Sequence, residues 1–108
     1  MSFRLGNLAI ADSRSEDRDE VHYRARATGA DANTQHMLLI VNISPHGLMG
    51  RCDSAVAEGE RLHVHLPGVG PVVAEVRWAL GGRLGCQFDK PIDLAGYYEM
   101  VATMLRGK

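Results

Sequence analysis

The segment MLLIVNISPHGLM, residues 37–49, holds two apolar runs separated by six residues, Asn42 to Gly47. Asn and Ser side chains bond to nearby backbone in turns, Pro fixes φ, and Gly permits positive φ. The segment therefore predicts a turn that joins two β-strands. The polar side chains of this turn have a second use, because they can face outward and bind a ligand.

Period-two alternation of apolar and polar residues continues on both sides of this turn and indicates half-buried strands. We expect strands at residues 20–28, 36–43, 48–52, 60–66, 72–80 and 83–88. Residues 67–71 and Gly81-Gly82 predict tight hairpin turns. Trp78 falls on the apolar face of its strand, so we expect it to pack in the core rather than to serve as a stacking platform.

From Asp93 the apolar period changes to three and four residues, which predicts an amphipathic helix over residues 93–106. Asp93 is a good N-cap and Gly107 a good stop. The apolar stripe must be buried, either on the barrel itself or on a second copy of the chain, and it consists of Leu94, Tyr97, Tyr98, Val101, Met104 and Leu105. Six short strands followed by one helix indicate an antiparallel sheet closed into a small barrel or sandwich.

The composition describes one ordinary globular domain, residues 1–108, with 45% hydrophobic and 23% charged residues. The net charge of −1 implies no general attraction to a nucleic acid polymer or an anionic membrane, so any anion site must be a local cluster. No apolar run reaches membrane-span length and no signal peptide is apparent, so we expect a cytoplasmic protein. Cys52 and Cys86 are then expected to be reduced thiols packed in the core.

Several short patterns suggest chemistry only weakly. Ser44 and His46 share the turn, but no third group completes a catalytic set. His63 and His65 share one strand face, and a metal site there would need a further ligand such as Glu75. We therefore expect no catalytic residues and no metal. Residues 68–70 resemble a fragment of a phosphate loop, but a hairpin is the better interpretation.

Two strings remain, Arg14–Arg18 and Asn42–Gly47. Two arginines four residues apart can grip phosphate or the O6 and N7 atoms of guanine, while Asn42 and Ser44 offer acceptors that suit the donor-bearing edge of guanine. The pattern of the turn, Asp/Asn-x-Ser-x-x-Gly, is expected by chance only about 0.05 times in a chain of this composition.

These two strings resemble the signature of the PilZ domain family, R-x-x-x-R before the first barrel strand and D/N-x-S-x-x-G after the second. The resemblance covers residues 14 to about 92, and it continues in Gly59, Val76-Arg77-Trp78 and Leu84-Gly85-Cys86-Gln87-Phe88. It implies an all-β fold, a six-stranded antiparallel barrel of the split-barrel type with a C-terminal α-helix. The chain would then divide into a flexible arm (1–20), the barrel (21–89) and the helix (93–106).

The family resemblance also implies a function, that of a receptor for cyclic di-GMP. Arg14 and Arg18 would grip phosphate and guanine, and Asn42, Ser44 and Gly47 would hold the guanine and let the backbone approach it. The ligand would order the arm, and an effector protein would respond, with no chemistry on the ligand and no cofactor. We expect a monomer or weak homodimer. The main alternative is a PilZ adaptor that does not bind the nucleotide, and a single-stranded nucleic-acid barrel or a hydrolase is much less favoured.

Overall fold

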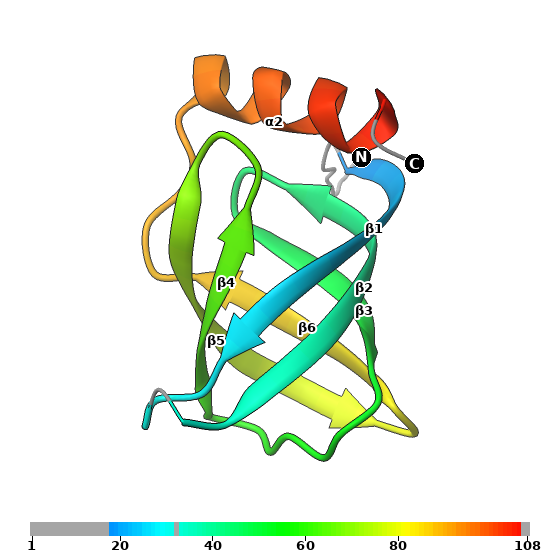
Figure 1. Ribbon diagram of the computed structural model, residues 1–108, viewed down its shortest axis with the longest axis vertical. Helices are drawn as coiled ribbons and strands as arrows, with labels where there is room; N and C mark the ends of the chain where they lie inside the picture. Colours follow the sequence, from blue (N-terminus) through cyan, green and yellow to red (C-terminus); the bar gives the residue numbers. More distant parts are fainter. Residues whose placement is uncertain (1–17, 32, 107–108) are drawn as a thin grey trace, which may run out of the picture.

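The described residues form a closed barrel of six antiparallel strands, and a C-terminal helix lies across one open end of it (Figure 1). The computed structural model describes residues 18–31 and 33–106. The elements are β1 (Asp19–Thr28), β2 (Gln35–Ser44), β3 (Gly47–Cys52), β4 (Arg61–Leu66), β5 (Gly70–Leu80), β6 (Arg83–Phe88) and α2 (Leu94–Arg106).

Strand order around the barrel is β1-β2-β3-β6-β5-β4, and every neighbouring pair is antiparallel. The barrel closes where β1 meets β4, with Ala27 opposite Val64 and Thr28 opposite His63. These two residue pairs close the sheet, and they decide between the barrel and the sandwich that the strand pattern alone left open. The predicted six-stranded barrel with a C-terminal helix is confirmed, and the strand bounds differ from those predicted by two residues at most.

Alternating side chains from all six strands fill the barrel. The completely buried ones include Leu38, Ile40, Ile43, Leu62 and Val64, each with no exposed surface. Cys52 and Cys86 lie in the same core as free thiols, as expected. Period-two patterning therefore places the core correctly wherever a strand keeps its regular alternation.

Trp78 breaks this regularity, and its predicted core position is wrong. A register shift between Val76 and Trp78 in the β5–β6 pairing inserts an extra residue into β5. Such a bulge exchanges the two faces of a strand. Val76 is buried, but Trp78 is 39% exposed and Leu80 is 81% exposed. Both side chains therefore lie on the outer wall of the barrel.

Helix α2 lies across the barrel end and buries Tyr97, Met100, Val101 and Met104. The Oδ1 atom of Asp93 accepts a hydrogen bond from the Gly96 amide at 2.9 Å, which confirms the predicted N-cap.

The buried stripe of α2 is narrower than predicted, because Leu94, Tyr98 and Leu105 are each more than half exposed. Met100, which the predicted stripe omitted, is buried instead. Within the described ranges, no helix is long and apolar enough to cross a bilayer.

Strand β1 begins at Asp19, one residue before the predicted start. Most of the predicted flexible arm, including the predicted site residue Arg14, falls on residues 1–17, which lie outside the described residues. The predicted helix stop Gly107 also lies outside them.

Candidate functional site

A groove of about 850 Å³ runs over the barrel wall beneath α2. This volume is in the range of pockets that hold small molecules and cofactors. Its lining comes from the start of β1, the β2–β3 turn, β5, β6 and α2, and includes Arg18, Ser44, Gly47, Trp78, Gly85 and Tyr98. Three of the sequence-predicted site residues, Arg18, Ser44 and Gly47, therefore line one groove.

Arg18 and Asn42 meet through a direct hydrogen bond, although they are 24 residues apart in the chain. The Arg18 Nη1 atom donates to Asn42 Oδ1 at 2.8 Å. Strand register explains the contact, since Glu20 pairs with Asn42 and Arg18 precedes Glu20 by two residues. On its other side, the Asn42 amide nitrogen lies 3.6 Å from Met49 Sδ. The structure thus joins the two predicted strings at one point.

Ser44 is buried and stabilises the turn. Its Oγ atom accepts a hydrogen bond from the backbone N–H of His46 at 3.2 Å, so the contact between these residues does not involve the imidazole. The carbonyl groups of Pro45 and His46 accept bonds from Ile92 and Phe88, both at 2.9 Å or less. The turn is therefore tied to the segment that leads into α2. A Ser hydroxyl that accepts one bond retains its own proton for donation.

Gly47 has a structural reason to be glycine. A Cβ atom at this position would lie 2.2 Å from the carbonyl oxygen of Cys86 on the neighbouring strand β6. No side chain fits against that backbone. The role of Gly47 toward a ligand, which the family resemblance implies, stays a prediction beside this structural one.

Trp78 completes the outer wall of the groove. Asn42 pairs with Met49, Met49 with Gly85, and Gly85 with Trp78, so these four residues form one row across β2, β3, β6 and β5. The indole lies over Gly85, where a Cβ atom would be 2.2 Å from Nε1. The sequence favoured core packing of Trp78 over a stacking platform. The structure instead favours the stacking platform, because the indole is an accessible aromatic surface. Gly85, which leaves room for the indole on the outer wall, could have indicated this position of Trp78. That Gly85 pairs with Trp78 is known only from the strand register.

A buried polar contact connects the groove to the helix. The Tyr97 hydroxyl lies 2.5 Å from Asp19 Oδ2 and 2.9 Å from the carbonyl oxygen of Ile43. Burial, followed by the hydrogen bond to Asp19, raises the pKa of Tyr97, so the phenol stays protonated and remains a donor. The carboxylate directly after Arg18 is thereby engaged by α2, while the Arg18 guanidinium bonds to Asn42.

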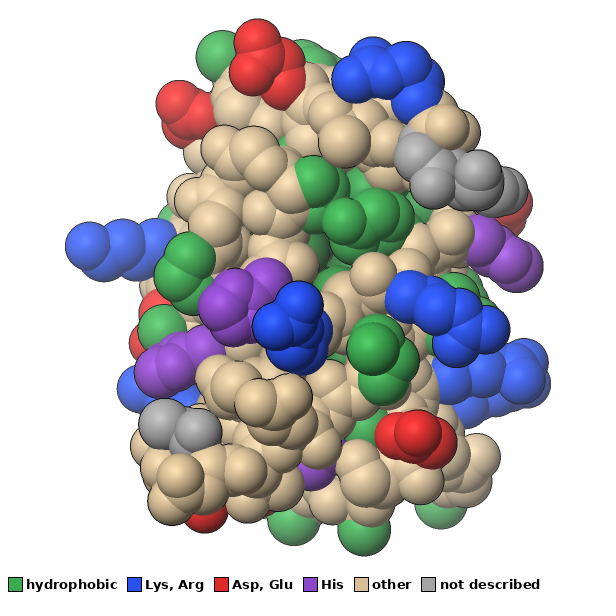
Figure 2. Space-filling view, in the orientation of Figure 1, with side chains coloured by type: hydrophobic (Ala, Val, Ile, Leu, Met, Phe, Trp, Pro, Cys, Tyr) green, Lys and Arg blue, Asp and Glu red, His purple; other side chains and the backbone are tan. Residues whose placement is uncertain are grey.

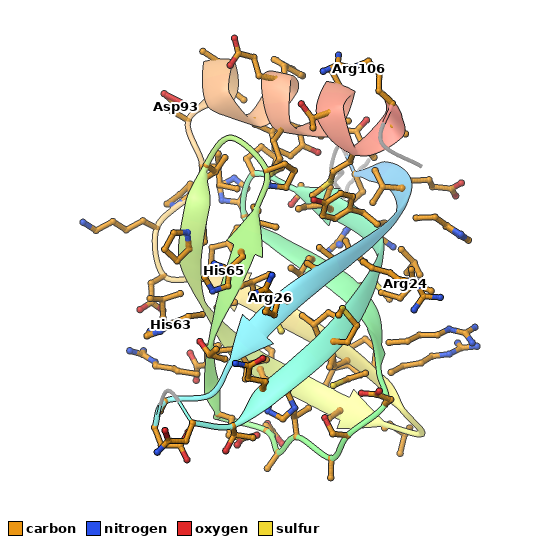
Figure 3. The ribbon with its side chains drawn as sticks, in the orientation of Figure 1. Arg24, Arg26, His63, His65, Asp93 and Arg106 are labelled. Atoms are coloured by element: carbon orange, nitrogen blue, oxygen red, sulfur yellow. The ribbon has the colours of Figure 1, made fainter. Side chains whose placement is uncertain are left out.

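The weaker sequence patterns lie on the surface of the described barrel. His63 and His65 are exposed on the outer face of β4 (Figure 3). Across residues 18–31 and 33–106, no three His, Cys, Asp or Glu side chains gather closely enough to hold a metal ion. Residues 68–70 lie where β4 turns into β5, and they form the predicted hairpin.

Comparison with known proteins identifies the family and the fold. The sequence matches the family described as PilZ domain over residues 12–105. The fold is similar to that of a crystal structure of the PilZ domain of CeSA from a cellulose synthesizing bacterium, with a TM-score of 0.58 and 15% identity over 85% of this chain and 97% of that one. No curated protein matched the sequence. The chain belongs to the PilZ domain family, a family of cyclic di-GMP receptors.

Proposed function

We propose that this PilZ domain binds cyclic di-GMP in the groove beneath α2 and passes the signal to an effector protein. The residues that would hold the ligand are Arg14, Arg18, Asn42, Ser44 and Gly47. One observation carries the proposal: Arg18 from the first signature string bonds to Asn42 from the second, at the margin of a groove of ligand size.

The chemistry of the groove suits a guanine nucleotide. A guanidinium has five N–H donors, and the Arg18–Asn42 bond uses one of them, which leaves others for a phosphate or for guanine O6 and N7. Ser44 retains a donor, and the exposed face of Trp78 offers a stacking surface. Base–aromatic stacking contributes about 1–3 kcal/mol per base in other nucleotide-binding proteins.

The contacts of the free domain oppose ligand binding only weakly. The Arg18–Asn42 bond is exposed, joins a charged donor to a neutral amide oxygen, and uses one N–H of the guanidinium. A phosphate is charged as well and can accept two parallel bonds from one guanidinium, so its pairing with Arg18 is the stronger one. Exchange of one partner for the other is therefore favourable. Asp19 follows Arg18 in the chain and bonds to Tyr97 of α2. A movement of Arg18 toward the ligand would therefore be transmitted to α2 through Asp19.

Isothermal titration calorimetry with cyclic di-GMP tests the proposal. We expect the wild-type domain to give a saturable heat signal as cyclic di-GMP is added. Arg18→Ala should bind the ligand at least tenfold more weakly, and its circular dichroism spectrum should be unchanged. The matched control is Arg26→Ala, since Arg26 is exposed on β1, the strand that Arg18 immediately precedes, and lies roughly 25 Å further along the chain. Absence of binding to the wild type at high micromolar ligand would refute the proposal. Normal binding by Arg18→Ala would refute the site.

A second candidate, an adaptor that works without the nucleotide, is favoured by the exposed apolar side chains of α2. Leu94, Tyr98 and Leu105 are 58%, 64% and 52% exposed. An effector that binds the domain equally well with and without cyclic di-GMP, and that loses binding in Tyr98→Ala, would support this candidate.

A further inference from the structure

Three exposed arginines lie in one row across the outer wall of the barrel: Arg24 on β1, Arg51 on β3 and Arg83 on β6. The register aligns them, because Arg24 pairs with Leu39, Leu39 with Arg51, and Arg51 with Arg83. Residues paired across a sheet share a face, so the three side chains extend to the same side. We call these three residues the arginine row.

The charge of the arginine row is uncompensated among the described residues. No described carboxylate lies within 4.0 Å of any of the three guanidinium groups, whereas Arg61 pairs with Asp89 at 3.3 Å. Arg51 and Arg83 are direct cross-strand partners, and like charges in that position destabilise a sheet. The overall net charge is −1, so a basic composition does not explain the cluster. The repulsion within the arginine row therefore lowers the stability of the free domain.

Apolar side chains lie among the arginines. Leu39 is half-buried between Arg24 and Arg51, and Leu80, the partner of Arg83, is 81% exposed. Basic side chains gather at the right edge of the surface in Figure 2, close to apolar ones, and Arg24 extends away from the barrel in Figure 3. Arginine mixed with exposed aliphatic side chains is typical of protein–protein interfaces.

We propose that the arginine row is the docking surface for an acidic segment of a partner protein. Carboxylates pair with guanidinium groups bidentately, and their approach would remove the repulsion between Arg51 and Arg83 that the free domain carries. A nucleic-acid strand fits less well, since the row holds no aromatic residue on which bases could stack. The proposal specifies the chemistry of the partner in the proposed function, but it does not require the nucleotide to bind.

The position of the row relates it to the groove. In β3, Arg51 follows the groove residue Met49 by two positions, and in β6, Arg83 precedes Gly85 by two. Two residues along a strand span about 7 Å. A partner on the arginine row would therefore lie beside a ligand in the groove, where it can sense the ligand directly.

Fluorescence anisotropy with a fluorescein-labelled peptide of alternating Glu, Ala and Leu tests the proposal on the whole chain. We expect the peptide to bind, its Gln counterpart not to bind, and the double variant Arg51→Glu/Arg83→Glu to weaken binding at least tenfold. The matched control is Lys90→Glu/Arg106→Glu, which changes the net charge equally at exposed positions outside the row. This control should bind within twofold of the wild type.

The single variant Arg51→Glu provides a second, independent measurement. It converts a like-charged cross-strand pair into an opposite-charged one, so it should raise the urea midpoint while it weakens peptide binding. A residue that only maintains the fold would not combine these two effects. An unchanged or lower midpoint would contradict the repulsion on which the inference depends.

Other outcomes would overturn the proposal. One is that the wild type does not bind the peptide at concentrations up to 1 mM. Another is that the Lys90→Glu/Arg106→Glu control loses as much peptide affinity as Arg51→Glu/Arg83→Glu. Binding of phosphatidylserine vesicles through the row in place of the peptide would assign it to a membrane, and self-association that requires the row, measured by sedimentation, would assign it to a second copy. Cyclic di-GMP titrations with Arg18→Ala are separate, so either proposal can fail alone.

Discussion

Gly47→Ala tests whether the glycine of the signature turn is required by the barrel itself. The added methyl group would meet three backbone atoms of β6: the Cys86 oxygen at 2.2 Å, and the Cys86 carbonyl carbon and Gln87 Cα at 3.3 Å each. A carbon and an oxygen normally stay more than 3 Å apart, so β3 and β6 must separate by about 1 Å locally. Because these atoms belong to a paired strand, no side-chain rotation can relieve the contact.

The size of the effect follows from two opposing contributions. Overpacking of this kind typically costs about 1–3 kcal/mol. Replacing glycine in a strand by alanine restores about 0.5–1 kcal/mol, since the unfolded chain loses conformational freedom. We therefore expect Gly47→Ala to lower the free energy of unfolding by about 1–2 kcal/mol, even without a ligand.

Urea unfolding followed by Trp78 fluorescence measures this loss, because Trp78 is the single tryptophan. The matched control is Gly29→Ala, whose new methyl group would meet nothing closer than 3.5 Å and which should stay within about 0.5 kcal/mol of the wild type. A wild-type midpoint in Gly47→Ala, or an equal loss in Gly29→Ala, would refute the reasoning. If the loss is found, weak ligand binding in Gly47→Ala cannot by itself assign a ligand contact to Gly47.

Two further predictions concern buried polar groups. Tyr97→Phe removes the buried donor near Asp19 and the Ile43 carbonyl and should cost about 1–3 kcal/mol in urea unfolding, whereas Tyr98→Phe, whose ring is exposed, should cost almost nothing. Burial, with a smaller contribution from Cys52, raises the pKa of Cys86 from 9.0 to about 12, so its thiol stabilises the fold fully below pH 9 and progressively less as the pH rises toward 12. At 1.36 kcal/mol per pH unit, this predicts a loss of about 2 kcal/mol between pH 7.5 and 10.5. Cys86→Ala should show a flatter dependence, and parallel curves for the two proteins would contradict the assignment to Cys86.

Local periodicity predicted most of the fold. Strand alternation and the change of period at Asp93 depend only on neighbours in the chain, so the six strands and the helix appear where expected. Trp78 was misplaced because the bulge before it arises from pairing with β6, which alternation within one strand does not contain. Leu94, Tyr98 and Leu105 were expected to be buried, but the end of a small barrel covers only a narrow stripe of the helix that crosses it.

For the candidate site, the sequence by itself determined the two signature strings and the kinds of ligand group they can contact. It also predicted a turn in residues 42–47, but the turn is shorter than predicted. Only Pro45 and His46 lie between β2 and β3, and Gly47 is paired with Ser44 without a positive φ. Of the side chains expected to act on nearby backbone, Ser44 does so through the His46 N–H. Only the tertiary structure decided that Arg18 reaches Asn42, that Gly47 is confined by Cys86, and that Arg24, Arg51 and Arg83 form one row. The physical reason is strand register, which is set by the packing of the whole barrel and brings together residues that no local pattern connects.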